Sequence, residues 1–457
     1  MSKKLCSRSA LILLSLATAS CSTLWPEYEK PQLNVPAPPA KPVTIDRQWW
    51  KAFEDPVLNA LVDEALKNNW DLAKAAATVA EAKAAAAAAR SYLLPRVDGV
   101  AKVGNTKRQL SFGSQDIDKN TTTGSIGVAV NWEVDLWDRI GQMNDAALAR
   151  LASSEHTRDS VDLSISSLVA ETWFQLRGLD AKLAITRDAA ASLKYATDLE
   201  YRRWKAEAGT ELAYSQSLAE YSATAARLPD IEGAISNTEL ALKLLIGRSP
   251  RGMSDVVPRG ERMKLPETPR EVDSTLLLRR PDVASAELLL VAAHADVNSA
   301  RAEFYPRLTL SLLAGFVAST SNAVSGMPLF WDASAGLVGP IFDGGLVQSK
   351  VDGAEARREK ALAHYQYTVS SAFRDTYQAL VLLDTSDRQV KSREDEVTTR
   401  KRAQVLAEKS YDAGRTSKFE VLTESIRVLN SQLFLVDAKF NQFTARSQYY
   451  KALGGGF

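Results

Sequence analysis

The stretch GVAVNWEVDLWDRIGQ, residues 127–142, alternates between two kinds of side chain. The even-numbered residues from Val128 to Leu136 are apolar, and Asn131, Glu133 and Asp135 lie between them. A period of two predicts a β-strand with one apolar and one acidic face. Past Arg139 the apolar pattern is helical for about seventy residues. A two-faced strand in a mostly helical chain needs a partner for each face.

Length and charge exclude some classes of protein. The chain has 457 residues, enough for roughly two or three domains. Lys and Arg number 56 against 55 for Asp and Glu, so the basic excess of a nucleic-acid-binding protein is missing. The three histidines are far apart in the sequence, so the sequence predicts no metal cluster.

The N-terminus indicates export. Basic residues precede a short apolar run at 10–17, and small residues follow it, as in a secretory signal. The cut before Cys21 resembles a bacterial lipobox, with Thr18 where leucine is usual. We therefore expect 1–20 to be a lipoprotein signal peptide and Cys21 to carry lipid, the alternative being an ordinary signal peptide. No later stretch is long and apolar enough for a spanning helix, so only strands would cross a membrane.

The two halves of the sequence resemble each other. Asp71–Arg96 aligns without gaps to Asp282–Arg307, a shift of 211, with nine of the 26 positions identical. DLWDRIGQ at 135–142 matches IFDGGLVQ at 341–348. Ordered similarity along two halves predicts a tandem duplication.

Each half has one plan. An Ala-rich helix ends at a Pro-Arg pair, two strands follow around a polar loop, and a helix of about 65–70 residues and a return helix of about 35 complete the half. The predicted first strands are 96–106 and 307–319, the loops 111–124 and 319–328, and the second strands 125–136 and 331–342. The expected division is an extended segment at 21–55, repeat 1 at 56–265 and repeat 2 at 266–457.

Four strands cannot close a barrel, and open strand edges in lipid leave backbone groups unpaired. The strands must therefore pair with other copies. Three copies give twelve strands, within the range of known barrels, and two give eight. The alternative is a soluble periplasmic coiled-coil protein that carries two hairpins.

Several motifs resemble those of one family. They are the lipobox-like start, DLWDRIGQ, RRPDVASAELLLVAAHADVNSARAEFYPRLTL at 279–310, GPIFDGG at 339–345 and YKALGGGF at 450–457. Together they resemble the TolC-like outer-membrane factors, in particular the lipoprotein branch that serves tripartite drug or metal efflux systems.

The resemblance implies a membrane β-barrel plus an all-α part: a homotrimer with a twelve-stranded barrel in the outer membrane and a long α-helical barrel in the periplasm. It implies a passive exit duct for small molecules, without catalysis or cofactor. The implied partners are a periplasmic adaptor, an inner-membrane pump and the lipid of the outer membrane.

The family pattern also suggests sites. The helix turns should be the periplasmic tips that contact the adaptor, at Gly209, Thr210, Gly414, Arg415 and Thr416. The glycines suit helix ends with left-handed backbone.

Beyond the second tip we expect a pore constriction at Phe419, Glu420, Thr423 and Glu424, where Thr423 replaces the family's aspartate. A ring of carboxylates would attract cations and gate their passage through the pore. The alternative is that both glutamates are ordinary solvated charges.

In the barrel, Glu133 and Asp135 should face the lumen, with Val130, Trp132 and Val134 facing lipid. Trp132 or Trp137 is expected near a membrane interface.

Rival functions have less support. The sequence has no phosphate-binding glycine loop at a strand–helix junction and no nucleophile–histidine signature, so we predict that the protein is not an enzyme. A type I secretion duct is the nearest rival, and the lipobox argues against it. A structural periplasmic lipoprotein that forms no channel is the rival from another class.

Overall fold

A computed structural model describes residues 25–33, 45–112, 115–254, 257–259, 263–268, 274–320 and 328–457. The predicted signal peptide and Cys21 lie outside the described residues. The chain divides into two compact units. Unit 1 comprises 1–33, 78–155 and 285–366, and unit 2 comprises 34–77, 156–284 and 367–457.

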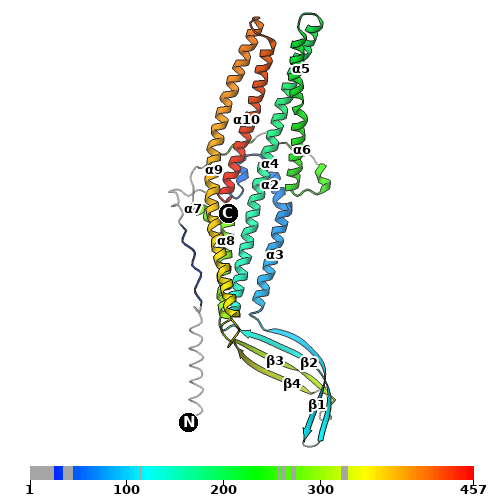
Figure 1. Cartoon of the computed structure of the whole chain (residues 1–457), viewed down its shortest axis with the longest axis vertical. Helices are drawn as coiled ribbons and strands as arrows, with labels where there is room; N and C mark the ends of the chain where they lie inside the picture. The colour runs from blue at the N-terminus through cyan, green and yellow to red at the C-terminus, as the bar shows by residue number, and fades with distance from the viewer. Residues whose placement is uncertain are drawn as a thin grey trace. The chain divides into compact units, whose positions relative to one another are not determined.

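The elements follow the duplicated plan (Figure 1). The first half contains η1 (Trp49–Phe53), α2 (Pro56–Asn68), α3 (Trp70–Ser91), β1 (Arg96–Phe112), β2 (Gln115–Val134), α4 (Arg139–Lys205), α5 (Glu211–Ala225), α6 (Arg227–Leu245) and η2 (Pro250–Ser254). The second half contains α7 (Ser274–Arg279), α8 (Pro281–Ala302), β3 (Arg307–Ser319), β4 (Leu329–Val338), α9 (Leu346–Asp412) and α10 (Lys418–Ala452).

Equivalent helices have equal lengths. Helices α3 and α8 have 22 residues each, and α4 and α9 have 67 each. Helix α10 has 35 residues, and α5 and α6 cover the equivalent span with a break at Ala226. Pro229 lies in the first turn of α6 and has no N–H to donate, which favours a new helix start there. The predicted duplication is confirmed.

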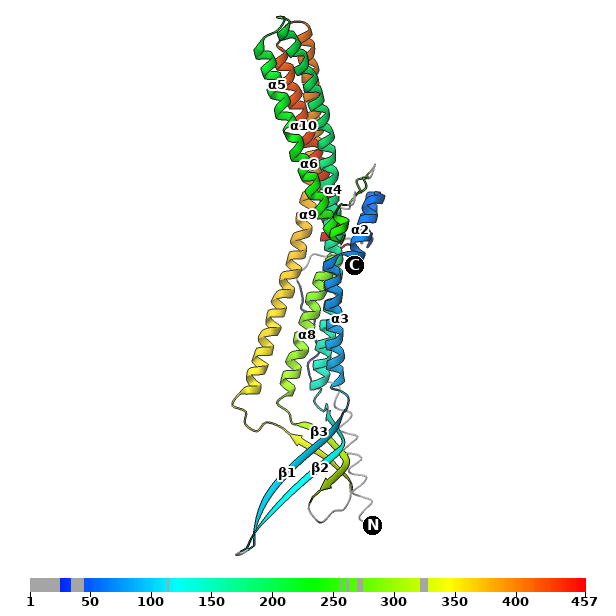
Figure 2. The ribbon, with the colours of Figure 1, turned by 90° about the vertical axis from the view of Figure 1, so that its right-hand side faces the viewer.

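The four strands form one antiparallel sheet in the order β1-β2-β3-β4, and Figure 2 labels the first three of them. β3 has its predicted bounds, and β4 ends at Val338 rather than Phe342 because Pro340 cannot donate to a strand ladder. The predicted loop at 111–124 is wrong, since β1 pairs with β2 as far as Phe112 and Gln115. Thr121–Thr123 are β-branched and therefore suit a strand despite their polarity.

The apolar core of unit 2 contains Trp49, Phe53, Trp173 and Phe174, each at most 1% exposed. Buried Asp55 is the N-cap of α2 and accepts hydrogen bonds from the Val57 and Leu58 N–H groups at 2.9 and 3.2 Å. Its second oxygen accepts from Trp173 Nε1 at 2.8 Å. One carboxylate thus begins a helix and ties it to α4.

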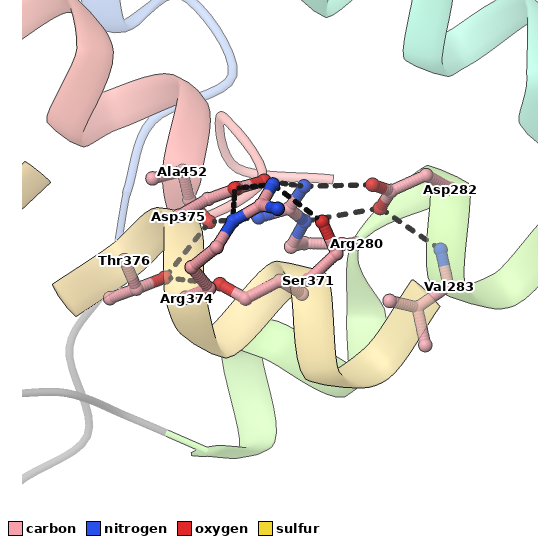
Figure 3. A network of polar contacts seen from close by, with 9 residues as sticks. Arg280, Asp282, Val283, Ser371, Arg374, Asp375, Thr376 and Ala452 are labelled. Carbon is pink, nitrogen blue, oxygen red and sulfur yellow. Dashed lines mark hydrogen bonds and ion pairs between the residues drawn. The ribbon is translucent and has the colours of Figure 1, made fainter. Parts of the chain in front are cut away.

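Arg280, just before α8, lies in a polar network with α9 and the end of α10 (Figure 3). Its Nη1 donates to the Ala452 carbonyl at 2.8 Å, and its Nη2 lies 2.7 Å from Asp282 Oδ2 and 3.5 Å from Asp375 Oδ2. A cation at a helix C-terminus is favoured by the helix dipole.

Among the described residues, no helix is long and apolar enough to span a membrane.

Candidate functional site

One face of the sheet carries a continuous band of apolar residues. The strand registers bring apolar residues of all four strands to this face, and we call it the apolar face. Its members are Val97, Gly99, Ala101 and Val103 of β1; Ile126, Val128, Val130, Trp132 and Val134 of β2; Leu308, Leu310, Leu312, Ala314 and Phe316 of β3; and Leu329, Trp331, Ala333, Ala335 and Leu337 of β4.

Much of the apolar face is uncovered. Val103 is 83% exposed, Trp331 72% and Leu329 67%. Along β1 the face changes after Val103, because Asn105 and Lys107 are the next residues on it. An exposed apolar band with a polar end marks a surface that meets an apolar environment.

The opposite face is more polar. Asn131 Oδ1 accepts from Ser311 Oγ at 3.0 Å, and Glu133 forms an ion pair of 2.8 Å with Arg139. Glu133 lies on the face opposite the apolar face, and Arg139 of the same chain balances its charge. Asp135 does not belong to the strand, because β2 ends at Val134. Its carboxylate accepts from the Gly141 N–H at 2.7 Å in the first turn of α4, so its prediction as a strand residue is wrong.

Both predicted interface tryptophans lie at the same end of the sheet as the helices. Trp132 Nε1 donates to the Leu93 carbonyl at 3.1 Å, and Trp137 Nε1 donates to the Pro306 carbonyl at 2.7 Å. The Trp137 ring stacks on Tyr305 with 4.8 Å between centroids. Trp25 donates from Nε1 to the Trp137 carbonyl at 2.8 Å. The described N-terminal segment is thus held at this end, four residues after Cys21.

The first helix tip joins α4 to α5 in unit 2. The Ala208 and Glu207 N–H groups donate to the Arg203 and Trp204 carbonyls at 2.9 and 3.0 Å, a Schellman motif. The left-handed residue of that motif is Glu207, at φ 58°, so the predicted left-handed role of Gly209 is wrong. Thr210 is the N-cap of α5 and accepts from the Ala213 N–H at 3.2 Å.

The second tip joins α9 to α10 with the same motif. The Arg415 and Gly414 N–H groups donate to the Ser410 and Tyr411 carbonyls, each at 2.8 Å. Gly414 has φ 67°, as predicted for a left-handed helix end. Gly414 is therefore the counterpart of Glu207 rather than of Gly209, and Arg415 and Thr416 follow it.

The tips carry residues that the sequence reading missed. Arg203 Nη1 donates to Tyr411 Oη at 2.6 Å and so links the two tips. Tyr201, Trp204 and Tyr214 form a ring cluster in which Trp204 and Tyr214 stack at 5.5 Å. The signal that could have revealed the cluster is the YRRW sequence at 201–204, with two aromatic residues three apart on one helix face.

The predicted constriction residues all lie in the first turns of α10. Phe419 is 43% exposed and Glu420 is also exposed, and Glu420 accepts a hydrogen bond from Thr416. Thr423 Oγ1 donates to the Phe419 carbonyl at 2.9 Å. Glu424 is mostly buried, with its side chain 13% exposed and ion-paired to Arg427. The two carboxylates therefore differ, because Glu424 is ion-paired to Arg427 whereas Glu420 accepts a hydrogen bond from the neutral Thr416.

No cluster of three or more His, Cys, Asp or Glu side chains suited to a metal ion occurs in the described part of the chain. The arrangement offers instead an exposed apolar sheet face, two open sheet edges and two helix tips.

Comparison with known proteins agrees with this geometry. Residues 61–248 and 273–455 match the sequence model of the family described as outer membrane efflux protein. The pyoverdine export outer membrane protein OpmQ of Pseudomonas putida is 31% identical over 461 residues, which cover 98% of this chain and 97% of the relative. The probable outer membrane lipoprotein SilC of Salmonella typhimurium is 27% identical over 462 residues, covering 98% and 99%. The crystal structure of the Campylobacter jejuni CmeC outer membrane channel superposes with a TM-score of 0.88 at 26% identity, covering 95% of each chain.

Proposed function

The chain belongs to the outer membrane efflux protein family and is an outer-membrane efflux channel, and we propose that it works as a homotrimeric, passive exit duct of a tripartite pump. Three sheets of four strands close one barrel of twelve in the outer membrane. The helices extend the duct into the periplasm. Small molecules such as drugs or metals leave through it without catalysis or a bound cofactor.

The carrying observation is the exposed apolar face of a sheet whose two outer strands are β1 and β4. Lipid would satisfy such a face, since it contains no charged residue from Val97 to Val103 or from Ile126 to Val134. Lipid cannot form hydrogen bonds with the backbone N–H and C=O groups of the two open edges, and each unpaired group costs several kcal/mol. Pairing with other copies removes both edges.

The energy must come from partners, because a passive duct has none of its own. We propose that an inner-membrane pump supplies it and that a periplasmic adaptor contacts the tips at Gly209, Thr210, Gly414, Arg415 and Thr416. Beside the second tip, α4, α9 and α10 enclose a groove of about 710 Å³ lined by Leu193, Val405 and Leu422 among others. Charged residues, among them Lys401 and Glu408, line the same groove, and a groove with both apolar and charged walls suits an adaptor's amphipathic helix.

The pore constriction is proposed at Phe419, Glu420, Thr423 and Glu424. Exposed Glu420 supplies the carboxylate ring, because Glu424 is neutralised by Arg427. Glu133 is proposed to line the barrel lumen, and Asp135 to lie at its helical end. We also propose that Cys21 carries lipid, which is supported by the similarity to SilC, a probable outer membrane lipoprotein. The proposed limits of the two repeats are 56–265 and 266–457.

Two measurements test the duct. The purified protein should run as a trimer on a gel until it is heated, and it should form ion-conducting pores in planar bilayers. A stable trimer without conductance would indicate a structural lipoprotein. A monomer that neither assembles nor conducts would contradict the proposal entirely.

A further inference from the structure

The duplication allows the strand pairing between copies to be worked out residue by residue. Arg96 begins β1 and Arg307 begins β3, so these strands correspond by a shift of 211. Within the hairpins Arg96 pairs with Asn131 and Arg307 pairs with Val338. Asn131 therefore corresponds to Val338, and β2 corresponds to β4 by a shift of 207.

The junction between the two hairpins is visible in the chain. There β2 pairs with β3, and Val130 lies opposite Leu312. In a ring of copies, β4 meets β1 of the next copy at the equivalent junction. The two shifts convert Val130 to Leu337 and Leu312 to Ala101.

We propose that β4 of one copy pairs antiparallel with β1 of the next copy with Leu337 opposite Ala101, so that Gly336 lies opposite Lys102. This inference rests on the proposed assembly and specifies its interface. The same register extends the pairing from Val338 opposite Val100 to Phe330 opposite Arg108.

The faces of the strands support this register. The apolar face uses odd-numbered residues in both β1 and β4, and the register places odd-numbered residues opposite odd-numbered ones. A slip of one residue would bring the polar face of one copy beside the apolar face of the next. Only slips of two residues would preserve the band, and these are the alternatives that an experiment has to separate.

Exposed residues beside the strands give independent support. Ile341 and Phe342 follow β4 and are completely or almost completely exposed, at 103% and 92%. By the shift of 207, Ile341 corresponds to Val134, which lies opposite Leu308 of β3 and is half-buried. The residue equivalent to Leu308 is Val97, which is 64% exposed. In the proposed register the next copy's Val97 would cover Ile341.

Disulfide cross-linking tests the register. Cysteines form a disulfide when their Cα atoms lie about 4.4–6.8 Å apart, which holds for directly opposite strand residues and not for diagonal ones about 7–8 Å apart. The variant carries Gly336→Cys with Lys102→Cys, both on the more polar face. A Cβ at position 336 meets no atom within 4 Å, so cysteine fits there.

The matched controls shift one cysteine by two residues: Gly336→Cys with Gly104→Cys, and Gly336→Cys with Val100→Cys. The unsubstituted protein and Gly336→Cys alone control for Cys21. After oxidation in membranes and boiling without reductant, the 336/102 pair should give about tenfold more covalent dimers and trimers than either control pair.

The outcomes separate the two proposals. Preferential cross-linking of 336/104 or 336/100, or none of the three pairs cross-linking in a protein that still forms heat-sensitive trimers, would overturn the register and leave the trimer intact. Absence of trimers in the unsubstituted protein would overturn the proposed function itself.

Discussion

In the first repeat Asn69 donates from Nδ2 to the Leu245 carbonyl at 2.7 Å, and in the second Arg280 donates from Nη1 to the Ala452 carbonyl at 2.8 Å. The two donors correspond by the shift of 211, and the two carbonyls correspond by the shift of 207. Each donor precedes the helix that leads toward the sheet, and each carbonyl ends the return helix. Both repeats thus join the same two helix ends.

The chemistry of this bond differs. Asn69 Oδ1 also accepts from the Asp71 and Leu72 N–H groups at 2.8 and 3.2 Å, so one neutral side chain begins α3 and holds the end of α6. Arg280 requires two carboxylates, Asp282 and Asp375, to balance a charge that is only 9% exposed. The duplicated chain has kept the connection and changed the residue, so the second repeat should depend more strongly on its donor.

Removing the two donors should therefore have unequal effects. Arg280→Ala leaves Asp282 without its cation and removes one of the two arginines beside Asp375, which still pairs with Arg374. It should lower the free energy of unfolding by about 3 kcal/mol. Asn69→Ala loses a helix cap and one neutral hydrogen bond, which cost about 2 kcal/mol together. Urea unfolding of the purified protein measures both values.

Arg280→Lys is the control, because it keeps the charge and loses the planar fork, and it should fall between Arg280→Ala and the parent. A larger loss for Asn69→Ala than for Arg280→Ala would contradict the comparison.

The helix tips offer a second contrast. Gly414→Ala forces an alanine into the left-handed region where its Cβ meets open space, so only backbone strain acts, at about 1 kcal/mol. Glu207→Gly should relieve the equivalent backbone strain at the first tip. Because glycine also adds entropy to the unfolded chain, the net stabilisation should be about 0.5 kcal/mol or less. Thermal unfolding of both variants gives the signs.

Gly233→Ala is the matched control for Gly414→Ala. Gly233 lies inside α6, and a Cβ added there meets open space, so this substitution should stabilise the protein. Stabilisation by Gly414→Ala would disprove the helix-end assignment.

The proposed constriction sharpens the contrast between return helices. Glu420 and Glu424 have Ala213 and Ser217 as counterparts in α5, so the first repeat has no carboxylate at these two positions. Glu420→Ala with Glu424→Ala should raise single-channel conductance or inward drug leak, with lower cation selectivity. Planar bilayers report conductance and selectivity, and Glu424→Ala alone should change both less because Arg427 already neutralises that residue. Unchanged pores in the double variant would end the gate proposal.

The smallest expected effect concerns pH. Burial raises the pKa of the Glu171 carboxyl, against a hydrogen bond from Ser167 and the charge of Lys451. Counted from the start of each long helix, its counterpart is Gln378. A raised pKa in the folded state means that the stability contributed by Glu171 is complete below its unfolded pKa and is lost as pH rises through the folded pKa.

Glu171→Gln should therefore match the parent in melting temperature in mild acid and exceed it slightly at neutral pH. Thermal melts at pH 4 and pH 7 measure this difference. An advantage for the variant that shrinks as pH rises would refute the assignment.

Much of the fold could be predicted because its causes are local. Alternation from Val128 to Val134 predicted a strand, and two Pro-Arg pairs predicted where helices give way to strands. The long strands β1 and β2 were underestimated, because Thr121–Thr123 look polar alone and become strand only when β1 supplies hydrogen-bond partners.

The site residues were harder to predict where contacts are distant in sequence. Composition suggested Gly209 for the first left-handed position, and the chain places Glu207 there instead. Asp135 continues the alternating pattern, yet it caps a helix because the strand ends one residue earlier. Arg280 was visible only as part of a motif, since its partner carbonyl lies 172 residues away.

The central claim is that the apolar face meets lipid in a closed barrel. Val130 lies in the middle of the apolar residues of β2, and Asn131 beside it lies on the opposite face. Asn131 is a better control than Glu133, whose ion pair with Arg139 would be lost on substitution. The direct measurement compares heat-sensitive trimers recovered from outer membranes for Val130→Lys and Asn131→Lys. A lysine in lipid costs roughly 2–4 kcal/mol, so we predict that Val130→Lys greatly reduces trimers while Asn131→Lys leaves them near the parent level. Equal recovery of the two variants would contradict the account.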